Sequence, residues 1–320
     1  MKLVTINNTT SGSPGALLTS GEVLHLAKAA KTGTLETWIP DSVRGILESG
    51  PDGLAVVKQL VKRVEAASPA VLAQLRETGA LTGADTRLLT PVPNPRLIVA
   101  AGLAFKSHLA EMAGTPTPAK PTGFLKSVNS IVGSDVSIAV PPDASGHIDY
   151  EGELAVVFGK TCHRVSAADA MSHVAGYMAA NDVSARDWVR EVWEAKEAWP
   201  ARLTWETNIM GKQFDTFTPL GPVLATADGI GDVTALEITT RLNGKEMQKA
   251  PISDLIFTLA ETIAYFSKWY TFQPGDILLT GTPAGVGVGR KPPVFMKAGD
   301  VIEIEVSSIG TLKNTLKAAA

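Results

Sequence analysis

The sequence predicts an α+β protein rich in β-structure, in which a small N-terminal α/β domain precedes a larger β-rich domain. Apolar residues recur at spacings of three and four through much of residues 1–95, a pattern typical of amphipathic helices. The segment "LLTPVPNPR" (88–96) then places three prolines within five residues, and such a segment cannot continue a helix. After it, short β-branched runs alternate with Gly, Pro, Asn and Asp. We therefore predict two domains, residues 1–95 and 96–320.

The N-terminal domain is predicted to begin with the short strand "KLVTI" (2–6) and to continue as helices. In each predicted helix the apolar spacing would place one apolar face against a core. The predicted helices are "GEVLHLAKAA" (21–30), "DSVRGILESG" (41–50) and "GLAVVKQLVKRVEAAS" (53–68).

The C-terminal domain is predicted to be a β-rich core with few helices. Its predicted strands lie in "LIVAAG" (97–102), "SIVGSDVSIAV" (130–140), "ELAVVFGK" (153–160), "ALEITTRLNGK" (235–245), "DILLTGTP" (276–283) and "DVIEIEVSSIG" (300–310). Two helices are predicted, over 166–182 with Ser166 as N-cap and over 253–270 with Ser253 as N-cap.

Composition narrows the class of protein. A net charge of -3 and a pI near 6.0 argue against nucleic-acid binding, which needs a basic surplus, so small molecules or further copies of the chain are the expected partners. The single cysteine, Cys162, excludes an intrachain disulfide framework and fits a reducing compartment. The N-terminus turns polar after four residues, and no apolar run approaches the ~18 residues that span a bilayer. We therefore expect a cytoplasmic protein that does not enter a membrane.

Acidic residues gather at the start of one predicted strand, in "GHIDYEGELAVVFGK" (146–160). Glu151 and Glu153 are two apart, so their carboxylates should point to the same face. Asp182 ends a later apolar segment and could converge on them. Three oxygen ligands without cysteine suit Mg²⁺, with Mn²⁺ or Ca²⁺ as alternatives. The plainer alternative is a solvent-facing strand edge with a surface pair of acids.

A histidine and a glutamate, His108 and Glu111, follow the apolar run 97–102 at a spacing of three. On a helical turn they would share one face, where a carboxylate orients an imidazole and favours its action as a base. This pair is a candidate for activating water. The alternative is an ordinary polar pair on an exposed first turn.

The stretch "LLTGTPAGVGVGR" (278–290) has the glycine spacing of a dinucleotide-binding loop, but that fingerprint must open a helix, and "RKPPVF" follows here. We reject that function. A Thr and Gly turn at a strand end offers hydroxyl and N–H donors to an anion, so Thr282 is a candidate ligand contact. A tight turn that needs glycine for its conformation explains the stretch equally well.

Six motifs together resemble the fumarylacetoacetate hydrolase (FAH) family and its C-terminal catalytic domain. They occur in the family's order and cover roughly residues 96–316. The motifs are "DYEGELAVVFGK", "GYMAANDVSARD", "KQFDTFTPLGP", "LNGKEMQ", "PGDILLTGTPAGVG" and "GDVIEIEVSSIGTLKN". The resemblance implies an FAH-type rolled mixed β-sheet in the catalytic domain, and a homodimer.

The resemblance also implies roles for individual residues. A divalent ion would be held by Glu151, Glu153 and Asp182, with Lys212 beside it to offset carboxylate charge and stabilise a developing oxyanion. Two further positions match family positions that meet the substrate. Arg186 would contact the substrate or support the site, and Thr282 would bind the substrate's carboxylate end.

The chemistry that the resemblance implies is metal-dependent hydrolysis of a carbon–carbon bond in a β-diketo acid, such as an acylpyruvate, fumarylpyruvate or fumarylacetoacetate. His108, oriented by Glu111, would activate water, in the breakdown of aromatic compounds. An alternative is a decarboxylase or tautomerase of a small 2-oxo acid such as oxaloacetate, since decarboxylases also carry a His-Glu pair there. A catalytically silent ligand-binding protein is the third hypothesis.

The sequence departs from the family after "SARD", where Trp188 and Val189 stand near a position that is often glutamine. The segment from Trp188 to Met210 is longer than in compact members. It contains four of the six tryptophans, Trp188, Trp193, Trp199 and Trp205. These side chains could line a pocket for a bulkier, more apolar substrate, or form a dimer contact or lid.

Overall fold

A large mixed sheet forms the centre of the computed structural model, which describes residues 1–32, 38–112, 114–144, 146–187 and 195–319. In spatial order its strands are β4 (Leu81–Thr82), β3 (Val23–His25), β2 (Ser13–Leu17), β1 (Lys2–Ile6), β14 (Thr218–Thr226), β12 (Val174–Asn181), β11 (Gly152–Phe158), β17 (Ile277–Leu279), β6 (Ile98–Gly102) and β7 (Thr122–Leu125). Two short strands join at its side, β5 (Leu88–Leu89) beside β1 and β8 (Ile131–Val132) beside β14. The pairs β17–β6 and β14–β8 are parallel, and the other pairs in the sheet are antiparallel.

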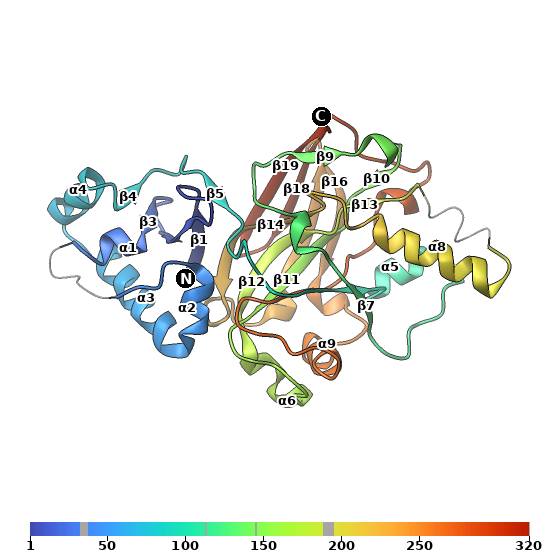
Figure 1. Cartoon of the computed structure of the whole chain (residues 1–320), viewed down its shortest axis with the longest axis horizontal. Helices are drawn as coiled ribbons and strands as arrows, with labels where there is room; N and C mark the ends of the chain where they lie inside the picture. Colours follow the sequence, from blue (N-terminus) through green and yellow to red (C-terminus); the bar gives the residue numbers. More distant parts are fainter. Residues whose placement is uncertain (33–37, 113, 145, 188–194, 320) are drawn as a thin grey trace.

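A second sheet packs against one face of the first (Figure 1). Its strands, in order, are β16 (Lys245–Pro251), β15 (Glu237–Leu242), β18 (Val301–Val306), β19 (Gly310–Ala318) and β9 (Ile138–Val140). The mixed, β-rich α+β class predicted from the sequence is therefore confirmed.

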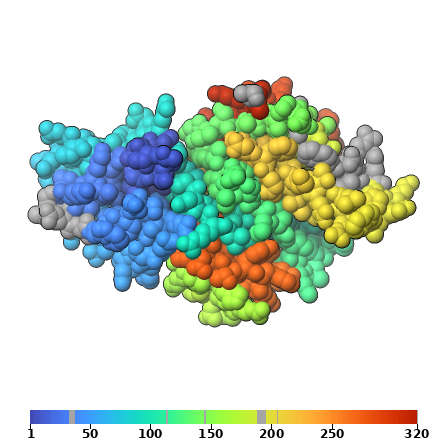
Figure 2. Space-filling model, in the orientation of Figure 1, coloured from blue at the N-terminus to red at the C-terminus, as the bar shows by residue number. Residues whose placement is uncertain are grey.

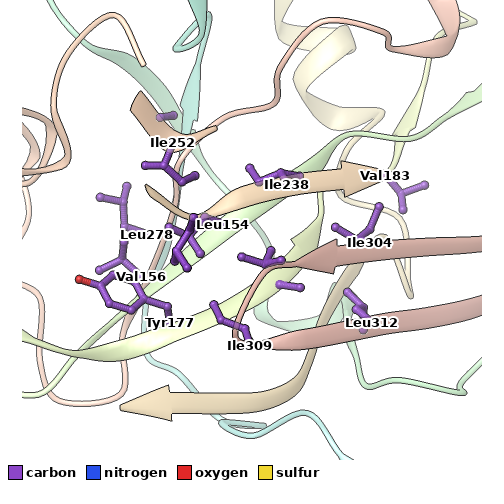
Figure 3. Packing of buried hydrophobic residues seen from close by; sticks show 14 of the residues in the cluster. Leu154, Val156, Tyr177, Val183, Ile238, Ile252, Leu278, Ile304, Ile309 and Leu312 are labelled. Carbon is purple, nitrogen blue, oxygen red and sulfur yellow. The ribbon is translucent and has the colours of Figure 1, made fainter. Parts of the chain in front are cut away.

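The alternation of β11 explains why the large sheet is covered on both faces. Leu154 and Val156 belong to the core that also contains Ile304 of β18, and Figure 3 shows both of them beside Leu278 of β17. Ala155 and Val157 belong instead to a second core, shared with the N-terminal helices. Successive strand side chains point to opposite faces, so one strand contributes to both cores. Each fully buried aliphatic side chain contributes roughly 1.5–3 kcal/mol of transfer free energy.

The described helices cover the sheet and its ends. They are α1 (Leu26–Ala29), α2 (Val43–Glu48), α3 (Gly50–Glu65), α4 (Pro69–Glu77), α5 (Lys106–Glu111), α6 (Ala167–Ala170), α8 (Ala198–Met210) and α9 (Leu259–Phe266). Helices α1 to α4 lie at one end of the molecule, whereas α5 and α8 lie at the other (Figure 1). No described helix is long and apolar enough to cross a membrane.

Three helix predictions were wrong in extent or type. Residues 21–30 form β3 followed by the single turn of α1. The helix predicted over 166–182 ends after one turn, and its second half is the central strand β12. The helix predicted over 253–270 is confined to α9, where Thr258 rather than Ser253 is the N-cap, in a capping box with Glu261. In β12, hydrogen bonding to a strand on each side outweighs the helix propensity of its alanines and methionine.

The N-terminal strands belong to the central sheet. Lys2 and Leu3 of β1 pair with Ala225 and Leu224 of β14. The predicted strand 2–6 is confirmed as β1. Because one sheet contains strands from both parts, the fold does not by itself separate residues 1–95 from residues 96–320. The division into these two domains stays a prediction.

Candidate functional site

An acidic cluster lies where β11 begins and β12 ends. The antiparallel register sets Glu153 opposite Ala180, and the N–H of Asp182 donates to the carbonyl of Glu151 at 2.9 Å. This register brings Glu151, Glu153 and Asp182 together, with carboxylate oxygens within 4.8 Å of one another. All three side chains are buried. The plainer sequence reading, a solvent-facing pair of acids, is therefore wrong.

Two buried lysines balance part of this charge. The Nζ of Lys212, just beyond the end of α8, donates to Glu151 Oε2 at 2.6 Å, Asp182 Oδ2 at 2.8 Å and Ser184 Oγ at 2.7 Å. Lys126 follows β7, and its Nζ donates to Asp182 Oδ1 at 2.6 Å. Burial lowers the pKa of Lys126 against the opposing effect of Asp182. The sequence did not indicate Lys126, because its partners come from distant segments.

Arg186, which is largely buried, pairs with the fully buried Asp149 at the edge of the cluster. The Arg186 guanidinium donates from Nε to Asp149 Oδ2 at 3.0 Å and from Nη2 to Glu151. Asp149 also accepts the N–H groups of Gly287 at 2.6 Å and Val288 at 3.1 Å. Asp149 thus anchors a loop and an arginine, a structural role that its sequence position did not reveal.

Glu151 and Glu153 differ in their electrostatic surroundings. Burial would raise the pKa of Glu151, but Lys212 and Arg186 outweigh burial and hold that pKa below its ordinary value. Burial, and then the charges of Asp182 and Glu151, raise the pKa of Glu153 well above its ordinary value. The Glu153 carboxylate accepts the N–H of Gly281 at 2.8 Å, and no described lysine or arginine forms an ion pair with it.

The donor set fits a divalent cation. Among the described residues, four buried carboxylates face two buried lysines and one largely buried arginine, so with all four carboxylates ionised the cluster has a surplus of one negative charge. The carboxylates are Asp149, Glu151, Glu153 and Asp182, and the cations are Lys126, Arg186 and Lys212. Oxygen ligands from carboxylates suit hard ions such as Mg²⁺ or Mn²⁺. Glu153 lacks a cationic partner among the described residues, so a bound divalent ion would supply its missing counter-charge.

His108 and Glu111 form the pair that their spacing predicted. Both lie on α5, and His108 Nδ1 is 2.6 Å from Glu111 Oε1. The other carboxylate oxygen, Oε2, accepts the N–H of Gly285 at 2.9 Å, which fixes the glutamate. The pair is largely buried, so the alternative of an exposed first turn is wrong. The helix is held at its start because the N–H of Ser107 donates to Asp254 at 3.1 Å.

A cavity of about 340 Å³ brings most of these groups together. Predicted site residues in its lining are His108, Glu151, Glu153, Asp182, Arg186, Lys212 and Thr282. Glu111 supports His108 from outside that lining. The Thr282 hydroxyl donates to the carbonyl of Gly152 at 3.0 Å and accepts from Gln248 at 2.7 Å. Its hydroxyl thus already has two internal partners.

The tryptophans of the 188–210 segment separate into two groups. Trp188 and Trp193 lie outside the described residues. Trp199 and Trp205 are on α8, and Trp205 contributes to the cavity lining.

The stacked sheets and the buried carboxylate and lysine centre define an α+β protein with an enzyme-like, oxygen-donor site. A family model described as "Fumarylacetoacetate (FAA) hydrolase C-terminal" matches residues 97–317. The chain belongs to the fumarylacetoacetate hydrolase family.

Relatives within this family differ in their named activities. The mitochondrial oxaloacetate tautomerase FAHD2A of Homo sapiens is 39% identical over 276 residues, covering 86% of this chain and 80% of that protein. The solved fumarylacetoacetate hydrolase of Exiguobacterium antarcticum superposes with a TM-score of 0.77 at 29% identity over 100% of both chains. The maleylpyruvate hydrolase of Sphingobium sp. SYK-6, solved with manganese(II) and pyruvate, gives a TM-score of 0.70 at 26% identity, also over 100% of both chains.

Proposed function

We propose that this protein is a divalent-metal-dependent tautomerase of a small 2-oxo acid such as oxaloacetate, interconverting its enol and keto forms. The observation that carries the proposal is the 39% identity, over most of both chains, to a protein named oxaloacetate tautomerase. The comparisons thus favour the tautomerase alternative over the carbon–carbon bond hydrolysis that was the main expectation from sequence. His108, which lines the same cavity as the carboxylates and is paired with Glu111, suits a reaction that consists of proton transfer.

Glu151, Glu153 and Asp182 are the residues that would hold the metal, with Mg²⁺ the ion first expected. Mn²⁺ has support from the related hydrolase solved with manganese(II), and Ca²⁺ remains an alternative. When bound, the ion would polarise the 2-oxo group of the substrate and lower the energy of negative charge on its oxygen.

His108 performs the proton transfer in this proposal. Glu111 accepts from Nδ1 and so orients the ring, which leaves Nε2 as the nitrogen for the substrate. In ketonisation Nε2 accepts the proton of the enol hydroxyl and then donates it to C3, so no proton is gained or lost overall. In the reverse direction Nε2 takes the C3 proton, Glu111 stabilises the imidazolium, and the proton passes to the substrate's oxygen.

In this proposal the cations of the cluster do not transfer protons; Lys212 supplies positive charge and Arg186 holds a carboxylate in place. Burial alone would lower the pKa of Lys212, but Asp182 and Glu151 raise it above its ordinary value, so its ammonium stays charged beside the substrate's oxygen. Arg186 holds Glu151 in place through its ion pair. Roles for Arg186 and Thr282 in binding the substrate's carboxylate end are part of the proposal.

The test follows the decay of enol oxaloacetate by its ultraviolet absorbance, with Mg²⁺ or Mn²⁺ present. The parent protein should accelerate ketonisation, and His108→Ala should slow the catalysed rate by about a hundredfold or more. Metal binding, measured by calorimetry, should be retained because His108 is not among the ligands. His163→Ala, which changes an exposed histidine, serves as the matched control. If the parent protein ketonised enol oxaloacetate no faster than the metal ion alone, the proposed function would be wrong.

Carbon–carbon bond hydrolysis is the second candidate, supported by the related maleylpyruvate hydrolase. In that reaction the same His108 and Glu111 pair would activate water. Product analysis with acetylpyruvate and fumarylpyruvate separates the two, since hydrolysis releases a pair of acids. Carbon dioxide from oxaloacetate would instead indicate a decarboxylase. The homodimer, the cytoplasmic location and the link to aromatic catabolism stay predictions of the sequence, and the human relative is named as mitochondrial.

A further inference from the structure

The cavity is lined by apolar side chains as well as by charged groups. They come from β7, from α8 and from segments next to β6, α5 and the glycine-rich loop. These apolar residues are Leu103, Met112, Phe124, Trp205, Ile209 and Val288. Helix α8, which carries two of them, projects at one end of the molecule (Figure 2). A volume of about 340 Å³ lies within the roughly 300–1,000 Å³ typical of small-molecule sites.

Asn208 is the exception in the α8 part of this lining, because it is polar. The residue is 8% exposed, and its Oδ1 is fully buried without a hydrogen-bond partner in the part of the chain that the structure describes. Six described residues carry such an atom, and only Asn208 among them lines the cavity. Buried amide groups are nearly always paired, so an unpaired one in a cavity wall points to a ligand.

The neighbours of Asn208 indicate what kind of ligand atom it meets. Trp205 and Ile209 lie beside it on the same helix, and Lys212 follows one turn later. Both lining cations, Lys212 and Arg186, are already paired with carboxylates of the protein. A second carboxylate on the substrate would therefore be buried against this wall without a free described cation, which is unfavourable.

We propose that Asn208 is a specificity-determining residue whose Oδ1 accepts a hydrogen bond from an uncharged hydroxyl group at the far end of the substrate. Trp205 and Ile209 pack against the apolar carbon that carries this oxygen. The substrate class is then a 2-oxo acid with an apolar, aromatic or aliphatic far end bearing one hydroxyl group, because an amide oxygen accepts and needs a donor as its partner. This inference rests on the tautomerase function and refines its substrate.

Two aryl 2-oxo acids that differ by a single hydroxyl test this assignment. The experiment measures kcat/KM for tautomerisation of 4-hydroxyphenylpyruvate, phenylpyruvate and oxaloacetate in the presence of Mn²⁺. The parent should prefer 4-hydroxyphenylpyruvate over phenylpyruvate by about tenfold, because a site built to bond a hydroxyl discriminates against its absence. It should also prefer 4-hydroxyphenylpyruvate over oxaloacetate.

Asn208→Leu keeps the approximate size of the side chain and removes the amide. It should abolish the preference for the hydroxylated acid, because kcat/KM for 4-hydroxyphenylpyruvate should fall about tenfold further than kcat/KM for phenylpyruvate. Thr207→Val, one residue away on α8 and outside the cavity lining, should keep the parent's preference. An equal loss on both aryl acids would indicate a merely structural role for Asn208 and overturn the inference.

The parent alone supplies a second measurement that does not depend on a folded variant. Equal kcat/KM values for the two aryl acids would overturn the inference even if Asn208→Leu does not fold. Acceleration of oxaloacetate but of neither aryl acid would also overturn it, and would leave the tautomerase function standing. Acceleration of none of the three acids would instead reject the tautomerase function.

Discussion

Lys126 places a fully buried ammonium between a carboxylate and the backbone. Its Nζ donates to Asp182 and to the carbonyls of Lys212 and Phe217. Lys126 therefore links three parts of the chain: the end of β7, the segment after α8, and Asp182 at the end of β12.

Replacing Lys126 by methionine should lower the free energy of unfolding by about 3–5 kcal/mol, because it leaves Asp182 with less compensation in a buried setting. Urea unfolding in metal-free buffer measures the change. Lys58→Met is the matched control, since Lys58 pairs with Asp228 near the surface and exposed pairs contribute about 0–1 kcal/mol. Equal effects of the two substitutions would contradict the role given to Lys126.

The substitution Glu153→Gln should leave the stability of the metal-free protein unchanged or raise it, and should weaken metal binding. Glu153→Gln keeps the size of the side chain and an oxygen for the N–H of Gly281, and it removes one of three crowded negative charges. We expect the metal-free protein to be at least as stable as the parent, since like charges no longer repel. Affinity for Mg²⁺ or Mn²⁺ should fall by at least about tenfold, because ligand charge sets affinity.

Calorimetric titration and thermal unfolding measure both effects. At a metal concentration of 100 times the parent Kd, the parent gains about 2.7 kcal/mol from binding, and the variant should gain much less. Glu305→Gln, which changes a partly exposed carboxylate paired with Arg241, is the control. If Glu153→Gln bound Mg²⁺ or Mn²⁺ with the affinity of the parent, the metal would have to bind at a site other than the acidic cluster.

The site residues differ in how far sequence could predict them. Glu151 and Glu153 followed from strand parity, and His108 with Glu111 from helical spacing, because both signals are local. Asp182 was a candidate to converge on the first two because it ends a later apolar segment, whereas the place of Lys212 beside them was expected only through the family resemblance. Three further residues that build the site, Lys126, Asp149 and Asn208, gave no usable local signal. Their functions arise from partners that are brought close only by the register of β11 with β12 and by the placement of α8.

At the scale of elements, local pattern predicted the strands better than the helices. The runs at 97–102, 153–160 and 276–283 became β6, β11 and β17, since β-branched runs suit a buried sheet. Residues 174–181 have alanines and a methionine that favour a helix, yet they form β12. The pairing of β12 on both edges depends on distant strands, which a window of local sequence does not contain.

The junction of β3 and α1 contains a buried histidine whose titration should affect stability. Burial, with a smaller contribution from Lys28, lowers the pKa of His25 below its ordinary value. The unfolded chain therefore binds the proton more tightly than the folded protein does. The stability that this imidazole contributes is present above its unfolded pKa of about 6.5 and is lost as the pH falls below it.

Replacing His25 by glutamine should remove this part of the pH dependence. The free energy of unfolding of the parent should fall more steeply than that of His25→Gln between pH 7.5 and pH 5.5. Urea unfolding at several pH values measures the two slopes. Parallel curves would mean that His25 does not contribute to acid sensitivity.

At the scale of the whole molecule, the central sheet joins the predicted N-terminal domain to the part that carries the site. The N-terminal helices and one face of β11, β12 and β14 share a single core, in which Leu47 lies with Val157 and Leu224. The strand bearing Glu153 thus has the N-terminal helices on one face and the second sheet on the other. Cores shared in this way make unfolding cooperative across both parts.

Leu47→Ala tests that cooperativity. The cavity left by a buried leucine should lower the free energy of unfolding by about 2–5 kcal/mol. If the two parts unfold as one unit, native-state hydrogen exchange should show the same loss of protection for amides in α3 and in β12. Leu312→Ala, in the core between the two sheets, is the matched variant and should reduce protection in both elements as well. Loss confined to α3 after Leu47→Ala would instead mean that residues 1–95 open independently of the site, and that the predicted boundary is also an energetic one.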